Sequence, residues 1–363
     1  MKQLFPLLAL LLLIGCTKQA ANDAVTIGVF EPQQGLYGET GQDTWRGVEL
    51  AHRLRPVAGG KKIELALYDT KSQSMEAANG VSVLSDDGAL ALIGTFGTDS
   101  MNRARPVIKA AKIPTVTGST AADLDRDYWI TPVCMNDDEQ ARAMAAFSAN
   151  TLGLRDIAVV VDAETGYGND LAYAFIHSLP SYVRTYRIDY HTGETRFARE
   201  VARLKKYPVD GIYCPGDAAA SAYFIRAVKD AGIRVPLLGA DRWENPSFKE
   251  IGRDAVEDAY FTAHYARYET FNQASDAFLL AYEKAYDRAP TSYAAMGYDA
   301  YNLIADAMND VGPDREAIAR YLRRLNTFDG ALGINKRHTT RNVPIMRQRG
   351  NRANYVTTVE VAY

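Results

Sequence analysis

The sequence predicts an α/β protein with two doubly wound parallel-sheet lobes, joined by a hinge with several crossovers. From residue 25 onward, short β-branched or apolar runs alternate with amphipathic helical stretches, which is typical of parallel sheets covered by helices. The chain of 363 residues is also too long for one compact core. Near residues 132–138 the alternation pauses and a new helix opens with acidic residues, so the second lobe is expected to begin there.

The strands are predicted from continuous apolar runs rather than from strict alternation. A strand that is covered on both faces has no solvent side, so it needs no polar residue at every second position. Runs of this kind recur between residues 25 and 264. The predicted strands are Val25–Phe30, Ile63–Asp69, Leu90–Gly94, Pro114–Gly118, Ile157–Asp162, Tyr186–Tyr190, Gly211–Cys214, Pro236–Ala240 and Ala259–His264.

Helices are predicted where apolar residues recur every three to four positions. After residue 264 helical stretches follow one another without a strand, and the C-terminal segment then alternates like a hairpin. We therefore expect residues 24–136 with 264–340 to form the N-terminal lobe, and residues 137–263 with 341–363 the C-terminal lobe. The predicted helices are Thr44–Leu54, Met75–Leu84, Glu139–Leu152, Ala218–Ala231, Phe271–Ala285 and Tyr293–Asn309, and the predicted hairpin strands are Asn342–Arg347 and Tyr355–Val361.

Residues 1–15 are predicted to be an export signal. Lys2 precedes an apolar run, Leu4 to Ile14, that is too short to span a bilayer comfortably. The residues Leu13-Ile14-Gly15-Cys16 resemble the bacterial lipobox, in which the cysteine is lipidated and becomes the mature N-terminus. The alternative is a short buried helix that stays in the protein. We expect lipid on Cys16, a tether over residues 16–23, and anchoring to a bacterial membrane in the periplasm or at the cell surface.

Export would place Cys134 and Cys214 in an oxidising compartment. Sequence spacing leaves two outcomes open for them. They either form a disulfide close to the hinge or remain two separately buried thiols.

Charge and composition argue against several classes of function. The 41 Lys and Arg against 44 Asp and Glu give a net charge of −3 without blocks of like charge, so no nucleic-acid partner is expected. The five His and three Cys form no CxxC or HxxxH spacing, and neither a metal nor another cofactor is expected. The sequence also lacks a GxSxG elbow, a Walker A loop and an HExxH motif, so an enzyme is disfavoured.

Hydroxyl residues gather in loops that follow predicted strands of the first half. Ligands of open α/β sheets bind beyond the carboxyl ends of the strands, where loops carry helix N-termini. Thr98 follows the third strand, and Ser119 and Thr120 follow the fourth. Their hydroxyls suit a carboxylate, because each donates one hydrogen bond beside a helix dipole that favours negative charge. The alternative for each residue is ordinary N-capping of a helix.

Tyrosines and carboxylates take the corresponding positions in the second half. Tyr167, Tyr213 and Asp241 lie at or just after strand ends. A carboxylate held with tyrosine hydroxyls suits an ammonium, because a buried cation needs a full negative charge and oriented oxygen acceptors. For Asp241 the alternative is a turn cap or a surface salt bridge with Arg242 or Lys249, and Asp217 is expected to be the N-cap of the following helix.

From about residue 24 to its end the chain resembles type I periplasmic binding proteins, specifically the branched-chain amino-acid (Leu/Ile/Val-type) substrate-binding proteins of ABC importers. The motifs that carry this resemblance are spread over both halves of the sequence. They are Val25-Thr-Ile-Gly-Val, Gly35-Leu-Tyr37-Gly38, Leu92-Ile-Gly94 with Ser100, Ala111-Lys-Ile-Pro114, Ser119-Thr120, Asp137-Asp-Glu-Gln140, Tyr167-Gly168 and Ser292-Tyr-Ala-Ala-Met-Gly-Tyr298-Asp-Ala.

The resemblance implies a hinged, two-lobed fold that closes on a small amino acid and delivers it to an ABC permease. Thr98, Ser119 and Thr120 match positions that bind the ligand carboxylate, and Asp241 matches the acidic position that pairs with the ammonium. The remaining implied site residues surround these: Tyr37 closing from the first lobe, Tyr167 and Tyr213 lining the second, and Asp137 assisting near the hinge. Phe96 and Trp243 depart from the family pattern, and we expect them to shape the side-chain pocket.

A monomer without catalytic activity is expected. The alternative is a non-transport sensor or binding lipoprotein of the same fold that recognises an amide, a urea or an aromatic acid, or that contacts a cell-wall enzyme. An importer needs a permease partner, whereas these alternatives do not.

Overall fold

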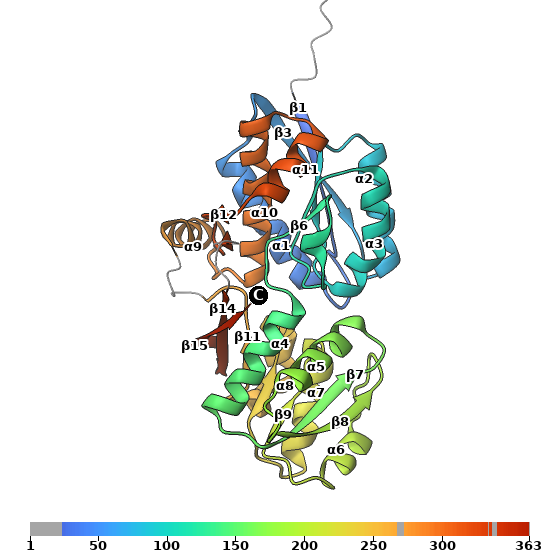
Figure 1. Cartoon of the computed structure of the whole chain (residues 1–363), viewed down its shortest axis with the longest axis vertical. Helices are drawn as coiled ribbons and strands as arrows, with labels where there is room; N and C mark the ends of the chain where they lie inside the picture. Colours follow the sequence, from blue (N-terminus) through green and yellow to red (C-terminus); the bar gives the residue numbers. More distant parts are fainter. Residues whose placement is uncertain (1–23, 267–271, 333, 336–339, 363) are drawn as a thin grey trace, which may run out of the picture.

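The computed structural model describes residues 24–266, 272–332, 334–335 and 340–362. These residues form two lobes stacked along the long axis of the molecule, with the hairpin β14–β15 beside their junction (Figure 1). Each lobe contains its own largely parallel sheet with helices on both faces, which confirms the predicted fold class. The predicted export signal, Cys16 and the tether lie outside the described residues.

The first lobe contains a six-stranded sheet in the order β2-β3-β1-β4-β5-β6. All neighbouring strands are parallel except β2 and β3. Alternate residues of β1 face opposite helical layers, so that Ile27 and Val29 pack with α1, α10 and α11, whereas Phe30 packs with α2 and α3. The elements are β1 (Ala24–Glu31), α1 (Gly38–Leu54), β2 (Val57–Ala58), β3 (Lys61–Asp69), α2 (Ser74–Asp86), β4 (Ala91–Gly94), α3 (Thr98–Ala111), β5 (Thr115–Thr117), β6 (Ile130–Pro132), α9 (Gln273–Tyr286), α10 (Ser292–Val311) and α11 (Arg315–Arg324).

The second lobe contains a seven-stranded sheet in the order β15-β14-β11-β10-β9-β7-β8. Strands β8, β7, β9, β10 and β11 are parallel to their neighbours. The C-terminal hairpin adds β14, which is antiparallel to β11, and β15, which is antiparallel to β14. Helices α4 and α5 cover one face, and α6, α7 and α8 cover the other. The elements are α4 (Asp137–Ala146), β7 (Asp156–Asp162), α5 (Gly166–Ser178), β8 (Arg184–Tyr190), α6 (Ala198–Leu204), β9 (Gly211–Tyr213), α7 (Ala218–Asp230), β10 (Leu237–Gly239), α8 (Pro246–Gly252), β11 (Tyr260–Thr262), β14 (Thr340–Arg349) and β15 (Arg352–Ala362).

Within the described part of the chain, the backbone passes between the lobes after β6, after β11 and before β14. A small antiparallel pair, β12 (Thr327–Phe328) and β13 (Ile334–Asn335), precedes the last passage. The first passage leads directly into α4, where Asn136 and Glu139 form a reciprocal capping box. This cap fixes the direction in which Asp137 enters the lobe junction.

The predicted elements agree with the structure in place and type, with local differences. The helix predicted over 139–152 is α4 followed by a π-helical turn, Phe147–Thr151. Cys134 and Cys214 are free thiols, each buried in the core of a different lobe. Among the described residues, no helix combines the length and the apolar character that crossing a bilayer requires.

Candidate functional site

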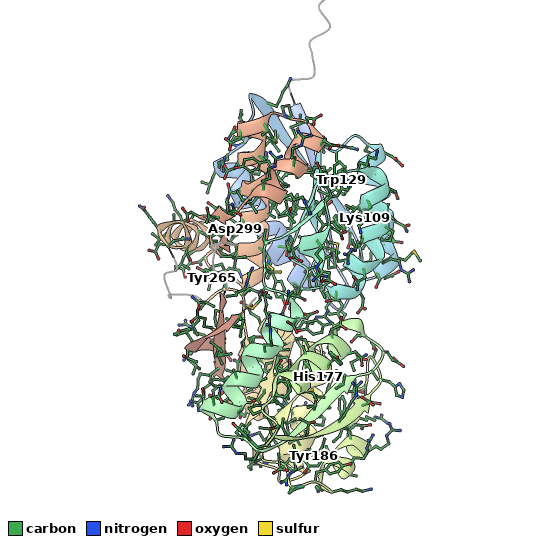
Figure 2. All side chains as sticks on the ribbon, in the orientation of Figure 1. Lys109, Trp129, His177, Tyr186, Tyr265 and Asp299 are labelled. Atoms are coloured by element: carbon green, nitrogen blue, oxygen red, sulfur yellow. The ribbon has the colours of Figure 1, made fainter. Side chains whose placement is uncertain are left out.

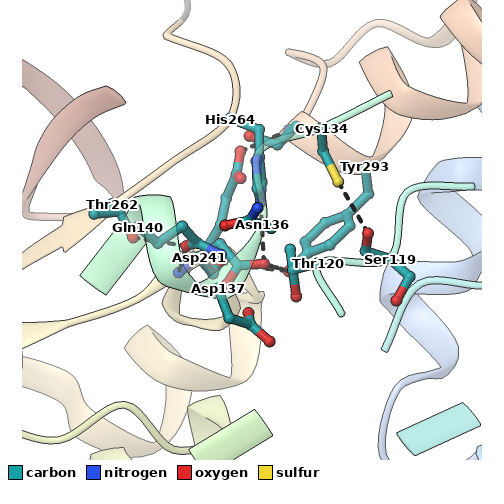
Figure 3. Close-up of polar contacts among 12 residues, drawn as sticks. Ser119, Thr120, Cys134, Asn136, Asp137, Gln140, Asp241, Thr262, His264 and Tyr293 are labelled. Carbon is teal, nitrogen blue, oxygen red and sulfur yellow. Dashed lines mark hydrogen bonds and ion pairs between the residues drawn. The ribbon is translucent and has the colours of Figure 1, made fainter. Parts of the chain in front are cut away.

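The candidate site lies where the loops at the carboxyl ends of both sheets meet. Figure 3 shows Ser119, Thr120 and Tyr293 from the first lobe facing Asp137 and Asp241 from the second. The sheet topology explains this arrangement, because parallel strands present all of their carboxyl ends at one edge. The functional side chains therefore come from short loops that rigid strands and capped helices hold in place.

Asp241 is the centre of a buried polar network. Its Oδ1 accepts a hydrogen bond from the Tyr167 hydroxyl at 2.6 Å, and its Oδ2 lies 3.3 Å from Nε2 of His264 and 3.4 Å from the Tyr293 hydroxyl. The Asp241 backbone N–H donates to Oε1 of Gln140 at 3.3 Å. Tyr167 belongs to the second lobe and Tyr293 to the first, so this one carboxylate touches both lobes.

The surroundings of Asp241 favour its ionised form. Burial by itself would raise the pKa of Asp241, but the contact with His264, the Tyr167 hydroxyl and the charge of Arg242 lower it below the ordinary value. The predicted alternative, a surface salt bridge with Arg242 or Lys249, is absent among the described residues. Instead, Lys249 Nζ donates to the Arg253 carbonyl oxygen at 3.0 Å.

Asp137 occupies the hydroxyl cluster that the sequence assigns to a ligand carboxylate. Thr98 Oγ1 donates to Asp137 Oδ2 at 3.0 Å and lies 3.4 Å from Thr120 Oγ1. Asp137 is 1% exposed, and its Oδ1 is buried without a hydrogen-bond partner among the described residues. Burial raises the pKa of Asp137 well above its usual range despite these hydroxyls, which favours the neutral carboxylic acid.

Ser119 has a local role in the structure. Its Oγ accepts a hydrogen bond from the Ala121 backbone N–H at 3.3 Å, and its carbonyl oxygen accepts one from Cys134 Sγ at 3.4 Å. These contacts stabilise the loop after β5, whereas the helical turn that follows, Leu124–Arg126, has Asp123 at its N-cap, so Ser119 does not act as the N-cap that the alternative expects. The prediction that Asp217 caps a helix is confirmed, since its Oδ1 accepts from the N–H groups of Ala219 and Ala220.

Arg242 is a buried cation at the lobe junction that the sequence analysis did not assign to the site. Its guanidinium carbon lies 3.5 Å from the ring centroid of Tyr167 and 5.3 Å from that of Tyr37. Its Nη1 donates to the Tyr37 hydroxyl at 3.3 Å. Burial would lower the pKa of Arg242, but Tyr37, Tyr167 and Asp241 hold it above its usual range, so the group remains charged.

A small cavity lies against Arg242, and aromatic rings form much of its wall. Phe96 packs edge to face against Tyr37 at 5.6 Å and against Tyr293 at 5.5 Å between ring centroids. The free space is about 10 Å³, close to the volume that one water molecule needs. The lining residues are Leu36, Tyr37, Thr40, Phe96, Asp217, Ala218, Ala219, Arg242, Asn245, Ser247 and Tyr293.

Two of the predicted site residues lie in the core of the second lobe instead of along this cavity. Tyr213 stacks on Phe175 at 4.0 Å, and Trp243 stacks on Phe248 at 4.4 Å between ring centroids. Both side chains are almost fully buried. Of the residues proposed from sequence, Tyr37 and Phe96 line the cavity, while Thr98, Thr120, Asp137, Tyr167 and Asp241 form the polar layer of the lobe junction.

Glu31 supports the loop that carries Phe96. Its carboxyl group accepts hydrogen bonds from the Phe96 backbone N–H and from Thr95 Oγ1. Burial raises the pKa of Glu31 to about 8, although both donors act in the opposite direction. Sequence reasoning did not assign Glu31 a role, because its partners lie on a neighbouring strand and loop more than 60 positions away.

Further polar contacts join the lobes around the cavity. Asn245 Nδ2 donates to Thr40 Oγ1 at 3.0 Å, and the Gly166 backbone N–H donates to Asp99 Oδ1 at 3.1 Å. The Ser292 N–H at the start of α10 donates to Glu244 Oε1 at 2.9 Å. The described conformation is therefore closed, with both lobes contributing donors and acceptors.

The described residues contain no group of three or more His, Cys, Asp or Glu side chains that could hold a metal ion. His264 lies beside Asp241 at the junction, whereas His177 lies on α5 of the second lobe (Figure 2).

Comparison with known proteins decides the family. The family model described as "Periplasmic binding protein" matches residues 24–360. The chain belongs to this family. Its relatives and structural neighbours place it among the type I periplasmic binding proteins of the branched-chain amino-acid group, as the sequence motifs predict.

The individual relatives have low sequence identity to this chain, but each match covers most of its length. The Leu/Ile/Val-binding protein of Escherichia coli is 25% identical over 338 residues, covering 89% of this chain and 90% of its own. The Leu/Ile/Val-binding protein homolog 3 of Brucella melitensis is 25% identical over 328 residues, covering 86% and 87%. The crystal structure of the leucine-binding protein LivK from Thermotoga maritima has a TM-score of 0.89 at 29% identity, covering 92% and 98%.

Another solved structure shares the fold, and its ligand is an aromatic acid instead of an amino acid. It is an ABC-transporter solute-binding protein from R. palustris, solved in complex with benzoate. Its TM-score is 0.80 at 20% identity, and the match covers 94% of this chain and 98% of the neighbour. The same architecture therefore accommodates ligands with and without an ammonium group.

Proposed function

We propose that this protein is the ligand-capturing component of an ABC importer, and that it binds a small amino acid, branched-chain or related, between its lobes. The observation that carries the proposal is the position of Asp241. Its carboxylate is buried, ionised and in contact with Tyr167 of one lobe and Tyr293 of the other. An ammonium that joined this network would interact with both lobes only when they are closed.

Ligand binding would then be coupled to hinge closure. Contacts that exist only in the closed form make the ligand prefer that form, and shifting a population from 1:99 to 99:1 requires a preference of about 5.5 kcal/mol. A desolvated ammonium–carboxylate pair provides a large part of this preference, since breaking a buried charge pair costs about 3–5 kcal/mol. The permease would recognise the closed form.

The proposed location follows from residues 1–16. Export by the predicted signal and lipid on Cys16 would hold the chain at a membrane surface, close to a permease. Relatives that are named as Leu/Ile/Val-binding proteins support an extracytoplasmic role of this kind. Mass spectrometry of the mature N-terminal peptide tests the anchor directly, because a lipidated Cys16 adds the mass of its acyl chains.

Binding of an aromatic acid is the second candidate. It is supported by the ring-lined cavity of Tyr37, Phe96 and Tyr293 and by the neighbour solved with benzoate. An aromatic acid has no ammonium, so Asp241 would keep only the partners that it already has. The two candidates therefore differ in whether the Asp241 charge is needed for binding.

The deciding experiment is a thermal-shift screen of the natural amino acids, benzoate and 4-hydroxybenzoate, followed by calorimetry on wild-type protein and on Asp241→Asn. The amino-acid proposal predicts that this substitution weakens binding at least about 100-fold, equivalent to about 3 kcal/mol. Asp156→Asn is the matched control, because Asp156 pairs with Arg184 at the start of β7, the strand end opposite the site, and should leave affinity unchanged.

Unchanged amino-acid affinity in Asp241→Asn would contradict the amino-acid proposal, and stabilisation by aromatic acids alone would support the second candidate. Transport and sensing are separated by an uptake assay. Deletion of the gene should abolish uptake of the ligand that the screen identifies, and uptake that persists would argue for a non-transport sensor.

A further inference from the structure

Arg242 is a buried cation without an anionic partner. The residue is 7% exposed, and within the described chain no carboxylate oxygen lies within 4 Å of its guanidinium nitrogens. The neighbouring Asp241 carboxylate is instead directed to Tyr167 and His264. Burying a charge without an opposite charge is costly, so such a group is an unusual feature in a binding cleft.

The groups in direct contact with the Arg242 guanidinium are neutral tyrosines. The ring of Tyr167 lies against the guanidinium at 3.5 Å, and the Tyr37 hydroxyl accepts a single hydrogen bond at 3.3 Å. A guanidinium has five N–H donors in a planar fork that matches the two oxygens of a carboxylate. Most of this donor capacity is unused by the described residues, and Arg242 lines the cavity.

The hydroxyl cluster assigned from sequence is already engaged. Thr98 donates to the buried carboxyl group of Asp137. A ligand carboxylate placed there would have to displace this contact and would lie beside a second carboxyl group. The cluster supplies no positive charge to a ligand carboxylate, whereas Arg242 does, so the cluster is a poorer site for an anion than Arg242.

We propose that Arg242 binds the carboxylate of the ligand, and that the ligand class is a small carboxylate whose apolar or aromatic body packs against Phe96 and Tyr293. The inference rests on the proposed function of ligand capture and deepens it. The carboxylate replaces the Tyr37 hydroxyl as the hydrogen-bond acceptor of Arg242. Because the cavity of the closed form holds about 10 Å³, the lobes part before the ligand enters and close again over it.

The test uses two pairs of probes, L-leucine with leucinamide and benzoate with benzamide, in which only the carboxylate is replaced. Calorimetry compares wild-type protein with Arg242→Gln, which removes the charge, and Arg242→Lys, which keeps the charge and removes the planar fork. Arg155→Gln is the matched control, because Arg155 also lies over a tyrosine ring, that of Tyr182 at 4.5 Å, but on the second lobe away from the junction.

Wild-type protein should bind the preferred carboxylate at least about 30-fold more tightly than its amide. Arg242→Gln should weaken carboxylate binding by a similar factor and leave amide binding nearly unchanged, since loss of one partner of a buried charged hydrogen bond costs about 2 kcal/mol or more. The carboxylate affinity of Arg242→Lys should lie between those of wild type and Arg242→Gln, and that of Arg155→Gln should equal that of wild type. If Arg242→Gln does not fold, the test uses Arg242→Lys together with the comparison of carboxylate and amide binding by wild-type protein.

Equal losses for carboxylate and amide in Arg242→Gln would show that Arg242 only supports the fold of the cleft, and would overturn the inference. Undiminished carboxylate binding in that variant would also overturn it while leaving ligand capture intact. If wild-type protein binds no amino acid or aromatic acid of the thermal-shift screen, the proposed function and this inference both fail.

Discussion

Replacing Glu31 by Gln is expected to remove a pH-dependent part of the stability of the first lobe. The carboxyl group of Glu31 is 1% exposed, and its pKa is about 8 in the folded protein against 4.5 for the ordinary group. Because the folded pKa is raised, the contribution of Glu31 to the unfolding free energy is largest below pH 4.5 and decreases as the pH rises towards 8. A difference of about 3.5 in pKa corresponds to at most about 5 kcal/mol, at 1.36 kcal/mol for each pKa unit.

Glutamine has the same shape and keeps an acceptor for the Phe96 N–H, but it does not titrate. Urea unfolding at pH 5, 6.5 and 8 measures the difference in unfolding free energy between the variant and wild type. Between pH 5 and pH 8 we expect the unfolding free energy of Glu31→Gln to increase by at least about 2 kcal/mol relative to that of wild type, a value that allows for partial relaxation of the site.

Glu76→Gln provides a control that should show no pH trend between pH 5 and pH 8. The Tyr68 hydroxyl donates to this partly buried carboxylate at 2.6 Å and lowers the pKa of Glu76. A lowered folded pKa gives its full stabilisation above pH 4.5 and loses it only at lower pH, so the difference in unfolding free energy between Glu76→Gln and wild type should stay constant from pH 5 to pH 8. Parallel pH profiles for wild type and Glu31→Gln would refute the account of Glu31.

The remaining predictions concern the polar layer, the core and the thiols. Thr98→Val removes the donor to Asp137 and should lower the unfolding free energy by about 1–3 kcal/mol in urea titrations. Trp243→Ala should lower it by about 3–5 kcal/mol, because the indole stacks on Phe248 in the core. In a Cys16→Ser background, Cys134 and Cys214 should react with a thiol reagent only after unfolding and without a reductant, and a missing thiol would indicate a disulfide.

The strands were predictable because their physical signal is local. A run such as Ile157–Asp162 is apolar throughout, and it becomes β7, which is buried along its whole length. Short edge strands such as β2 and β6 lack such a run and depend on neighbours that are distant in sequence. The helix after the hinge was predictable from its acidic start, but its π-helical ending depends on packing.

The candidate site was predictable in position and less so in the partners of its side chains. The loops that carry Thr98, Asp137 and Asp241 do converge, because parallel strands present their carboxyl ends at one edge of a sheet. Residue type alone could not indicate that Thr98 holds Asp137, since both partners appear equally suited to a ligand. The placement of Arg242 between Tyr167 and Tyr37 depends on how the closed lobes pack, and sequence adjacency to Asp241 suggested a salt bridge instead.

The central claim is that the cleft between the lobes captures a small carboxylate. Native mass spectrometry of the protein, purified under non-denaturing conditions and then incubated with the carboxylate that the thermal-shift screen selects, tests this claim directly. We expect one bound molecule for each chain, with occupancy lost in Arg242→Gln and kept in Arg155→Gln. A chain that keeps its unliganded mass with every amino acid and aromatic acid of the screen would contradict the claim.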